Sequence, residues 1–170
     1  MIRGFGLLRM LCISPRLHRL RMIILGFAVL LGGSTSMAHL FERIVVNGTP
    51  SVSAHILIKA PGEEIHKGDY VLVPTQNHFL PNGFDSLTKH VLCVEGDVLA
   101  FKRGAFYCNG EFLHRPKRQS LSGASLDAFF WREGVVPHGK VYVGSPHPDG
   151  FDSRYLGLFD LDDLTRLEAL

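Results

Sequence analysis

The hydrophobic pattern of the chain changes near residue 42. Residues 22–41 are almost continuously apolar, interrupted by the hydroxyl side chains of residues 34–36 and by His39. A helix needs about 20 such residues to span a bilayer. Beyond residue 42 the apolar residues occur in short runs separated by Gly, Pro, Asn and Asp, which is typical of β-strands bounded by turns. The pattern therefore predicts one N-terminal transmembrane helix, residues 22–41, followed by a mainly β domain, residues 42–170.

The short apolar runs predict seven strands and the turns that join them. A hairpin is expected around Lys102-Arg103-Gly104, and a second tight turn at Asn109-Gly110. Residues 76–87 and the basic residues 114–125 predict loops, whereas residues 160–170 predict a short amphipathic helix. The expected strands are residues 43–46, 54–60, 69–73, 89–94, 98–101, 105–108 and 139–144.

The positions of the charged residues are more informative than the net charge. With 18 Lys and Arg against 16 Asp and Glu, the chain offers no electrostatic argument for nucleic acid, and no such partner is expected. Five arginines precede the apolar stretch, and the first acidic residue is Glu42. Because basic flanks stay on the cytoplasmic side, residues 1–21 are predicted to be cytoplasmic. This places the chain in the inner (plasma) membrane as a single-pass protein with a periplasmic domain.

Two other interpretations of the N-terminus stay open. Ser36-Met37-Ala38 has the small-x-small pattern of a cleavage site, so the apolar stretch could be a cleaved export signal. Translation could also start at Met10 or Met22, which would shorten the basic flank. We favour the uncleaved anchor because the stretch continues apolar through Leu40 and Phe41. Every alternative directs the chain to the membrane.

The cysteines and histidines exclude some kinds of site. The three cysteines lack metal-ligand spacing, and no pair of histidines has the spacing of a zinc motif. No metal and no cofactor is therefore expected. Cys93 and Cys108 could form a disulfide if their part of the chain lies in an oxidising compartment.

Two residues suggest nucleophilic catalysis. Ser51 ends the stretch Asn47-Gly-Thr-Pro-Ser51, in which the Thr49 hydroxyl lies close by in the sequence. Lys89 begins an apolar strand, and burial there would lower the pKa of its amine and let it act as a general base for a serine hydroxyl. A turn and a solvated lysine are the plainer interpretations of the same residues.

The order of four sequence blocks resembles the type I signal peptidases, specifically the TraF-like branch that matures proteins of conjugal transfer. The first block, 47–51, resembles the Asn-x-Thr-x-Ser nucleophile motif of that branch. Lys67-Gly-Asp-Tyr-Val-Leu-Val73 resembles the strand that follows, and residues 89–97 resemble the block whose leading lysine is the base. Residues 134–144 with Phe151-Asp-Ser-Arg-Tyr155 resemble the closing block.

The resemblance implies a signal-peptidase-like antiparallel β domain and assigns roles by position. Ser51 would be the nucleophile and Lys89 the general base, while the Thr49 hydroxyl would contribute to an oxyanion hole with the Ser51 backbone N–H. The closing residues Asp152, Ser153 and Arg154 would support the site through hydrogen bonds and an ion pair.

Some positions depart from the pattern of the branch. Ser53 competes with Ser51 as nucleophile, although the register of the motif favours Ser51. Glu95 replaces a usual proline, and Ser145 stands where aspartate is usual. Gly150 replaces a serine whose hydroxyl helps to orient the lysine, a task that Thr88 or Ser153 could take over.

These observations predict a membrane-anchored serine endopeptidase. Its substrates would be exported precursor proteins with signal peptides, conjugative pilin among the possibilities, cleaved after a small-x-small motif. Hydrolysis and transpeptidation to a cyclic product both remain open. The runner-up is a non-catalytic bitopic assembly factor of a conjugation or secretion apparatus, and the altered residues Ser145 and Gly150 are its best support.

Overall fold

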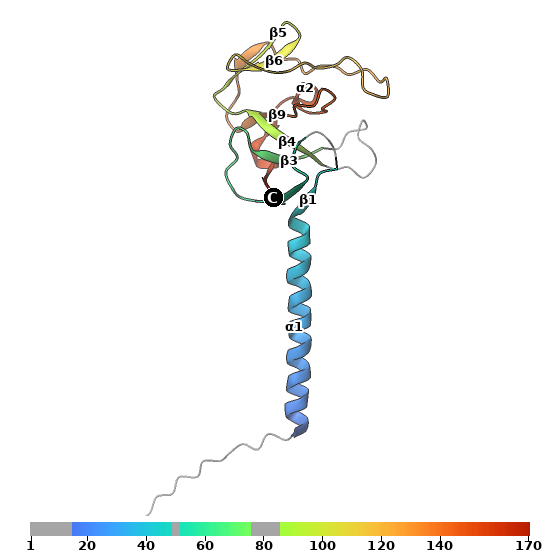
Figure 1. Ribbon diagram of the computed structural model, residues 1–170. Coiled ribbons are helices and arrows are strands. Elements are labelled where there is room, and N and C mark those ends of the chain that lie inside the picture. The colour runs from blue at the N-terminus through green and yellow to red at the C-terminus, as the bar shows by residue number, and fades with distance from the viewer. Residues whose placement is uncertain (1–14, 49–51, 76–85) are drawn as a thin grey trace, which may run out of the picture. The chain divides into compact units, whose positions relative to one another are not determined.

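The computed structural model describes residues 15–48, 52–75 and 86–170, and within the helix it describes the side chains of residues 21–33 and 41–43. The chain divides into two compact units, Met1–Glu42 and Arg43–Leu170. The first unit contains the helix α1, Pro15–Arg43, except for its last residue. The second unit contains all the strands (Figure 1).

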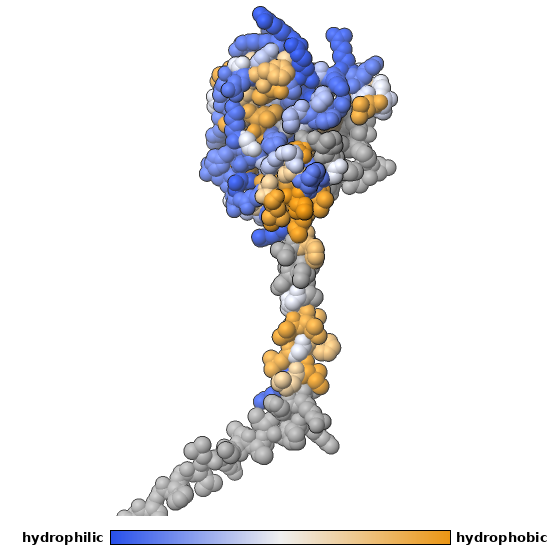
Figure 2. All heavy atoms as spheres, viewed as in Figure 1, coloured by the Kyte–Doolittle hydropathy of each residue, from blue (hydrophilic) through white to orange (hydrophobic). Residues whose placement is uncertain are grey.

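The described apolar side chains of α1 are exposed (Figure 2). Met22, Phe27 and Val29, for example, are 59%, 63% and 73% exposed. Within the described residues, no helix has both the length and the apolar character needed to cross a membrane.

The second unit is mainly β, as the sequence predicts, and its strands form two antiparallel sheets. The seven-stranded sheet has the order β1-β2-β11-β3-β4-β9-β10, and the four-stranded sheet has the order β7-β6-β5-β8. The bounds are β1 Ile44–Val46, β2 Ile56–Lys59, β3 Tyr70–Pro74, β4 Ser86–Cys93, β5 Val98–Lys102, β6 Ala105–Cys108, β7 Glu111–His114, β8 Glu133–Val135, β9 Lys140–Gly144, β10 Phe159–Asp160 and β11 Thr165–Ala169.

The C-terminal tail corrects the sequence prediction. Instead of an amphipathic helix, residues 160–170 form a short 3₁₀ helix η1, Leu161–Asp163, and the strand β11. β11 pairs with β2 on one side and β3 on the other, so Leu167 lies opposite both Lys59 and Tyr70. The tail therefore completes the larger sheet.

The hairpins of the smaller sheet follow from their turn residues. Arg103 and Gly104 join β5 to β6 with φ of 54° and 73°, and Asn109 and Gly110 join β6 to β7 with φ of 51° and 85°. Two consecutive positive φ values match the twist of an antiparallel hairpin. Both turns lie where the sequence predicts them.

Two apolar clusters form the core. The first packs alternate residues of β3, β4 and β9, which Figure 1 shows as the centre of the larger sheet. Its buried members are Val71, Val73, Val91, Val141, Val143 and Leu164. The second joins the two sheets and consists of Cys93, Leu99, Phe106, Cys108, Val136 and Tyr142.

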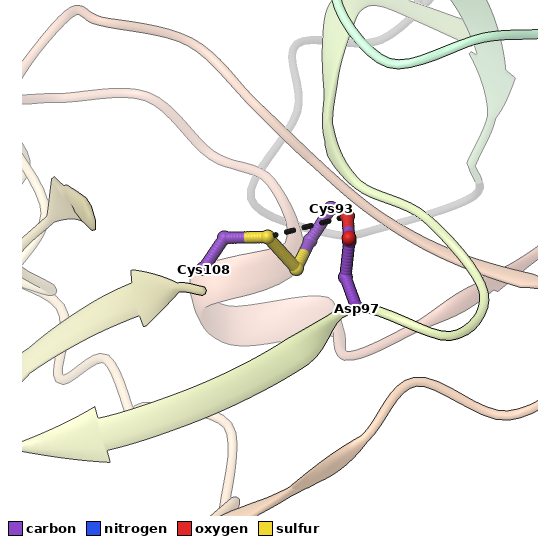
Figure 3. Close-up of side chains that lie close together, drawn as sticks. All are labelled: Cys93, Asp97 and Cys108. Atoms are coloured by element: carbon purple, nitrogen blue, oxygen red, sulfur yellow. Dashed lines mark hydrogen bonds between the residues drawn. A yellow bond between two sulfur atoms is a disulfide. The ribbon is translucent and has the colours of Figure 1, made fainter. Parts of the chain in front are cut away.

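A disulfide bond connects the sheets within the second cluster. Cys93 at the end of β4 is bonded to Cys108 at the end of β6, as the sequence allowed (Figure 3). Asp97 Oδ2 lies 3.5 Å from Cys108 Sγ. The side chains of Cys93, Asp97 and Cys108 are close enough to one another to be a candidate metal-binding group. Because thiolates are the ligand form of cysteine and these sulfurs are bonded to each other, the cluster serves as a covalent link between the sheets.

Candidate functional site

Lys89 lies in the middle of the larger sheet with its side chain buried. It is 2% exposed, and its position on β4 is paired with Val71 of β3. Burial disfavours the ammonium form and lowers the pKa of Lys89. The Asp152 carboxylate partly opposes this by raising the pKa, and the Arg154 guanidinium lowers it. The result is an amine that loses its proton more readily than a solvated lysine.

The closing block forms a buried ion pair beside β9. Arg154 donates from Nε to Asp152 Oδ1 and from Nη2 to Asp152 Oδ2, both at 2.8 Å, and neither side chain is exposed. Asp152 also caps the short helix α2, Ser153–Leu156, by accepting from the Arg154 backbone N–H. This bidentate pairing compensates the cost of burying both charges.

The same ion pair fixes the end of β9. The backbone N–H of Ser145 donates to Asp152 Oδ2 at 3.1 Å, and Arg154 Nη2 donates to the Ser145 carbonyl at 3.0 Å. Ser153 Oγ accepts from the Val143 backbone N–H at 2.9 Å. The three residues assigned to support of the site are thus all buried and all bonded to one segment, the strand paired with β4.

Gly150 packs against this cluster more tightly than a larger residue would allow. A Cβ atom at position 150 would lie 2.4 Å from Ser145 Oγ, 2.6 Å from Arg154 Nη2 and 2.8 Å from Asp152 Oδ2. Such distances are shorter than van der Waals contact, so the space at position 150 is already filled. The departures at positions 145 and 150 are therefore coupled, because the Ser145 hydroxyl occupies room that glycine leaves.

Thr49 and Ser51 lie outside the described residues, but the segments on either side of them are described. Asn47 is 8% exposed, and its Nδ2 donates to the carbonyls of Val52 and Ala54, both at 3.2 Å. Its backbone N–H donates to the His55 carbonyl at 2.9 Å. These bonds hold together the two ends of the segment that carries Ser51.

The residues that follow Ser51 differ in their surroundings. Val52 is buried at 3% exposure, which anchors the chain directly after the serine. Ser53 is exposed, and its hydroxyl is hydrogen-bonded to Tyr70 Oη at 3.1 Å. The competing nucleophile is therefore partnered with a phenol of β3.

A family model described as signal peptidase, peptidase S26, matches residues 16–167 of the chain. The chain belongs to this signal peptidase family. Members of the family are serine peptidases that act on precursors carrying signal peptides. The match covers most of the chain, including Lys89 and the closing block.

This signal peptidase family member was also compared with solved structures and with curated proteins. Among solved structures, a signal peptidase I from Enterococcus faecalis V583 is similar at 19% identity, covering 64% of this chain and 97% of that chain with a TM-score of 0.36. Among curated proteins, none matches the chain.

The structure also shows polar groups that sequence reasoning missed. Asn47 was noted only as part of a motif, and its bonds to Val52 and Ala54 emerge once the segment folds back. The predicted loop 114–125 includes His114, yet this residue ends β7 and is 6% exposed, with Nε2 bonded to Tyr142 Oη at 2.7 Å. Burial lowers the pKa of His114 to about 4, so the ring is neutral at pH 7. No spacing signal in the sequence points to that pair.

Proposed function

We propose that this member of the signal peptidase family is a membrane-anchored endopeptidase in which Ser51 is the nucleophile and Lys89 the general base. The observation that carries the proposal is the burial of Lys89, whose pKa is lowered in the absence of any directly paired carboxylate in the described structure. A lowered pKa gives a purely structural lysine no advantage, whereas a general base must be able to give up its proton. The family membership supplies the serine chemistry that such a base serves.

The proposed reaction proceeds through an acyl-enzyme. The Lys89 amine takes the proton of the Ser51 hydroxyl while Oγ forms a bond to the scissile carbonyl carbon, whose π electrons move to oxygen. The tetrahedral intermediate collapses as the C–N bond breaks, and the Lys89 ammonium gives its proton to the departing amine. Water, or an incoming amine, then attacks the ester with the same lysine as base, which releases Ser51.

Other residues would stabilise this sequence of steps. The Thr49 hydroxyl and the Ser51 backbone N–H would donate to the oxyanion. Asn47 supports this assignment, because its bonds to Val52 and Ala54 fix the ends of the segment that carries both groups. The Asp152–Arg154 pair and Ser153 would hold β9 against β4, and so hold Lys89 in place.

The proposed substrates are exported precursors cleaved after a small-x-small motif, with conjugative pilin as the narrower expectation of the TraF-like resemblance. The proposed location is the inner membrane, with residues 22–41 as the anchor, residues 1–21 in the cytoplasm and the β domain in the periplasm. The exposed apolar side chains of α1 and the five arginines near its start support this arrangement.

Co-expression with a precursor tests the proposal. We expect Ser51→Ala and Lys89→Ala each to leave a precursor with an Ala-x-Ala site uncleaved, and Ser53→Ala to process it at the parental rate. Immunoblots of membrane fractions measure cleavage and confirm that each variant accumulates. The mass of the product separates a linear chain from a cyclic one, because cyclisation retains one water less. Normal processing by both dyad variants would instead favour the non-catalytic assembly factor.

A further inference from the structure

Ser145 carries a buried hydroxyl that the described structure leaves unsatisfied. The residue is 1% exposed, and its Oγ has no hydrogen-bond partner among the described residues, although its backbone N–H and carbonyl are both bonded to the Asp152–Arg154 pair. Most buried polar groups have a partner, and an unpaired one destabilises the folded state. A hydroxyl kept in such a position therefore calls for a function.

The register of the sheet places this hydroxyl next to Lys89. Strand β4 pairs with β9 so that His90 lies opposite Gly144 and Val91 opposite Val143. Extending the same antiparallel register by one residue beyond the end of β9 would place Lys89 opposite Ser145. Side chains two residues apart share a face, so Lys89 lies on the face of Val91 and Ser145 on the face of Val143. Directly opposed residues have Cβ atoms about 5 Å apart, within reach of a lysine side chain.

Electrostatic contacts place the two residues in one environment. The pKa of Lys89 responds to the charges of both Asp152 and Arg154, and Ser145 is hydrogen-bonded to those same two side chains. The Ser145 hydroxyl occupies the space that Gly150 leaves beside the ion pair. Lys89 thus lies in the same buried, polar environment as Ser145 Oγ, a neutral oxygen that can still accept a hydrogen bond.

We propose that Ser145 is a positioning residue for Lys89, whose ammonium donates a hydrogen bond to Ser145 Oγ after the amine has taken the proton of the nucleophile. This inference rests on the proposed function, because it assumes that Lys89 cycles between amine and ammonium. The bond orients the ammonium and stabilises its charge while it holds the proton for the departing amine. Such a bond would give the buried hydroxyl the partner that it lacks among the described residues.

The two hydroxyls that the sequence suggests for this task, those of Thr88 and Ser153, are less suited to it. Thr88 is adjacent to Lys89 on β4, so its side chain points to the opposite face of the sheet. Ser153 Oγ already accepts from the Val143 backbone N–H. Of the three, Ser145 alone combines the right face with an oxygen that lacks a partner among the described residues.

The pH dependence of kcat/KM, measured with the full-length protein and a fluorogenic peptide spanning an Ala-x-Ala site, tests this inference. In Ser145→Ala the ammonium loses an acceptor, so the pKa of Lys89 falls further and the acid limb of the profile moves to lower pH. We expect a shift of roughly one unit, a tenfold change in proton affinity, together with a lower kcat. Ser145→Cys, which retains a weak acceptor, should fall between Ser145→Ala and the parent. The matched control Thr88→Ala should keep the parental limb.

The outcomes separate this inference from the proposed function. If Lys89→Ala abolishes cleavage and Ser145→Ala leaves the acid limb unmoved, Lys89 acts without Ser145 and this inference is wrong. An equal shift in Thr88→Ala would also overturn it, because a general loss of packing would then explain the result. If Lys89→Ala cleaves the peptide at the parental rate, the proposed function itself fails.

Discussion

Asp152 Oδ1 and Arg154 Nε lie 2.8 Å apart, and neither side chain is exposed to solvent. The pair is formed by residues only two positions apart, yet its remaining bonds reach Ser145, His147 and Pro148. One ion pair thus determines the path of the chain from the end of β9 to α2.

Breaking this ion pair should destabilise the domain strongly. Asp152→Ala would leave the Arg154 guanidinium buried without a counter-charge, which costs about 3–5 kcal/mol of unfolding free energy. Urea denaturation measures the loss. Glu133→Gln, which removes the exposed partner of Lys102, is the matched control and should cost under about 1 kcal/mol. Equal effects of the two changes would contradict the structural role assigned to Asp152.

Asn47 should affect cleavage more than folding. In Asn47→Asp the side chain keeps its shape but loses the two donors to Val52 and Ala54, and its carboxylate faces two carbonyl oxygens. We expect the segment that carries Ser51 to lose its geometry, with kcat/KM falling roughly 5- to 150-fold, as a loss of about 1–3 kcal/mol implies. Thermal unfolding of the variant and the parent measures the effect on folding, which should be smaller than the effect on cleavage. A parental rate would show that Asn47 does not position the nucleophile.

The disulfide should stabilise the connection between the two sheets. Cys93 and Cys108 are 15 residues apart, and closing a loop of that length is worth about 3 kcal/mol. Dithiothreitol should lower the urea midpoint of the parent by a corresponding amount. The double variant Cys93→Ala/Cys108→Ala should unfold at that lower midpoint with or without reductant. An identical midpoint for oxidised and reduced parent would exclude the proposed contribution.

His114 should make the domain sensitive to acid. Its pKa is about 4 in the folded domain against 6.5 for the free side chain, chiefly because of burial, with Asp152 raising it and Arg154 lowering it. Between pH 6.5 and 4 the unfolded chain binds a proton that the folded domain does not, so stability falls as the pH falls. The loss reaches about 3 kcal/mol below pH 4.

One variant separates the contribution of His114 to acid sensitivity from the titration of carboxylates. His114→Gln should flatten the stability profile between pH 6.5 and 4 relative to the parent, while His55→Gln, which changes an exposed histidine, should leave the slope unchanged. If His114→Gln has the parental slope, the ring does not carry the acid sensitivity.

The sequence predicts the local elements well where the signal is itself local. Arg103-Gly104 and Asn109-Gly110 form the expected turns because their positive φ values depend on the residues themselves. The prediction for the C-terminal tail is wrong because the structure of the tail depends on distant strands. Residues 160–170 predict a short amphipathic helix, but β11 forms because it pairs with β2 on one side and β3 on the other.

The candidate site shows the same division. The burial of Lys89 and of the Asp152–Arg154 pair follows from their positions in apolar strands and in the closing block. The relationship of Lys89 to Ser145 depends on a register between β4 and β9 that no local pattern encodes. The bonds of Asn47 likewise form only when the chain folds back on itself. The spacing of residues in the sequence therefore could not assign a role to Ser145 or to Asn47.

The central claim is that Lys89 acts as a neutral general base, and the most direct test is the pH profile of kcat/KM for the parent and for Lys89→Ala. The parent should show an acid limb below the ordinary lysine pKa of 10.5, because burial lowers the pKa of this amine. Lys89→Ala should lose at least about 100-fold in rate together with that limb. A Lys89→Ala enzyme that retains both the parental limb and a rate close to parental would contradict the account.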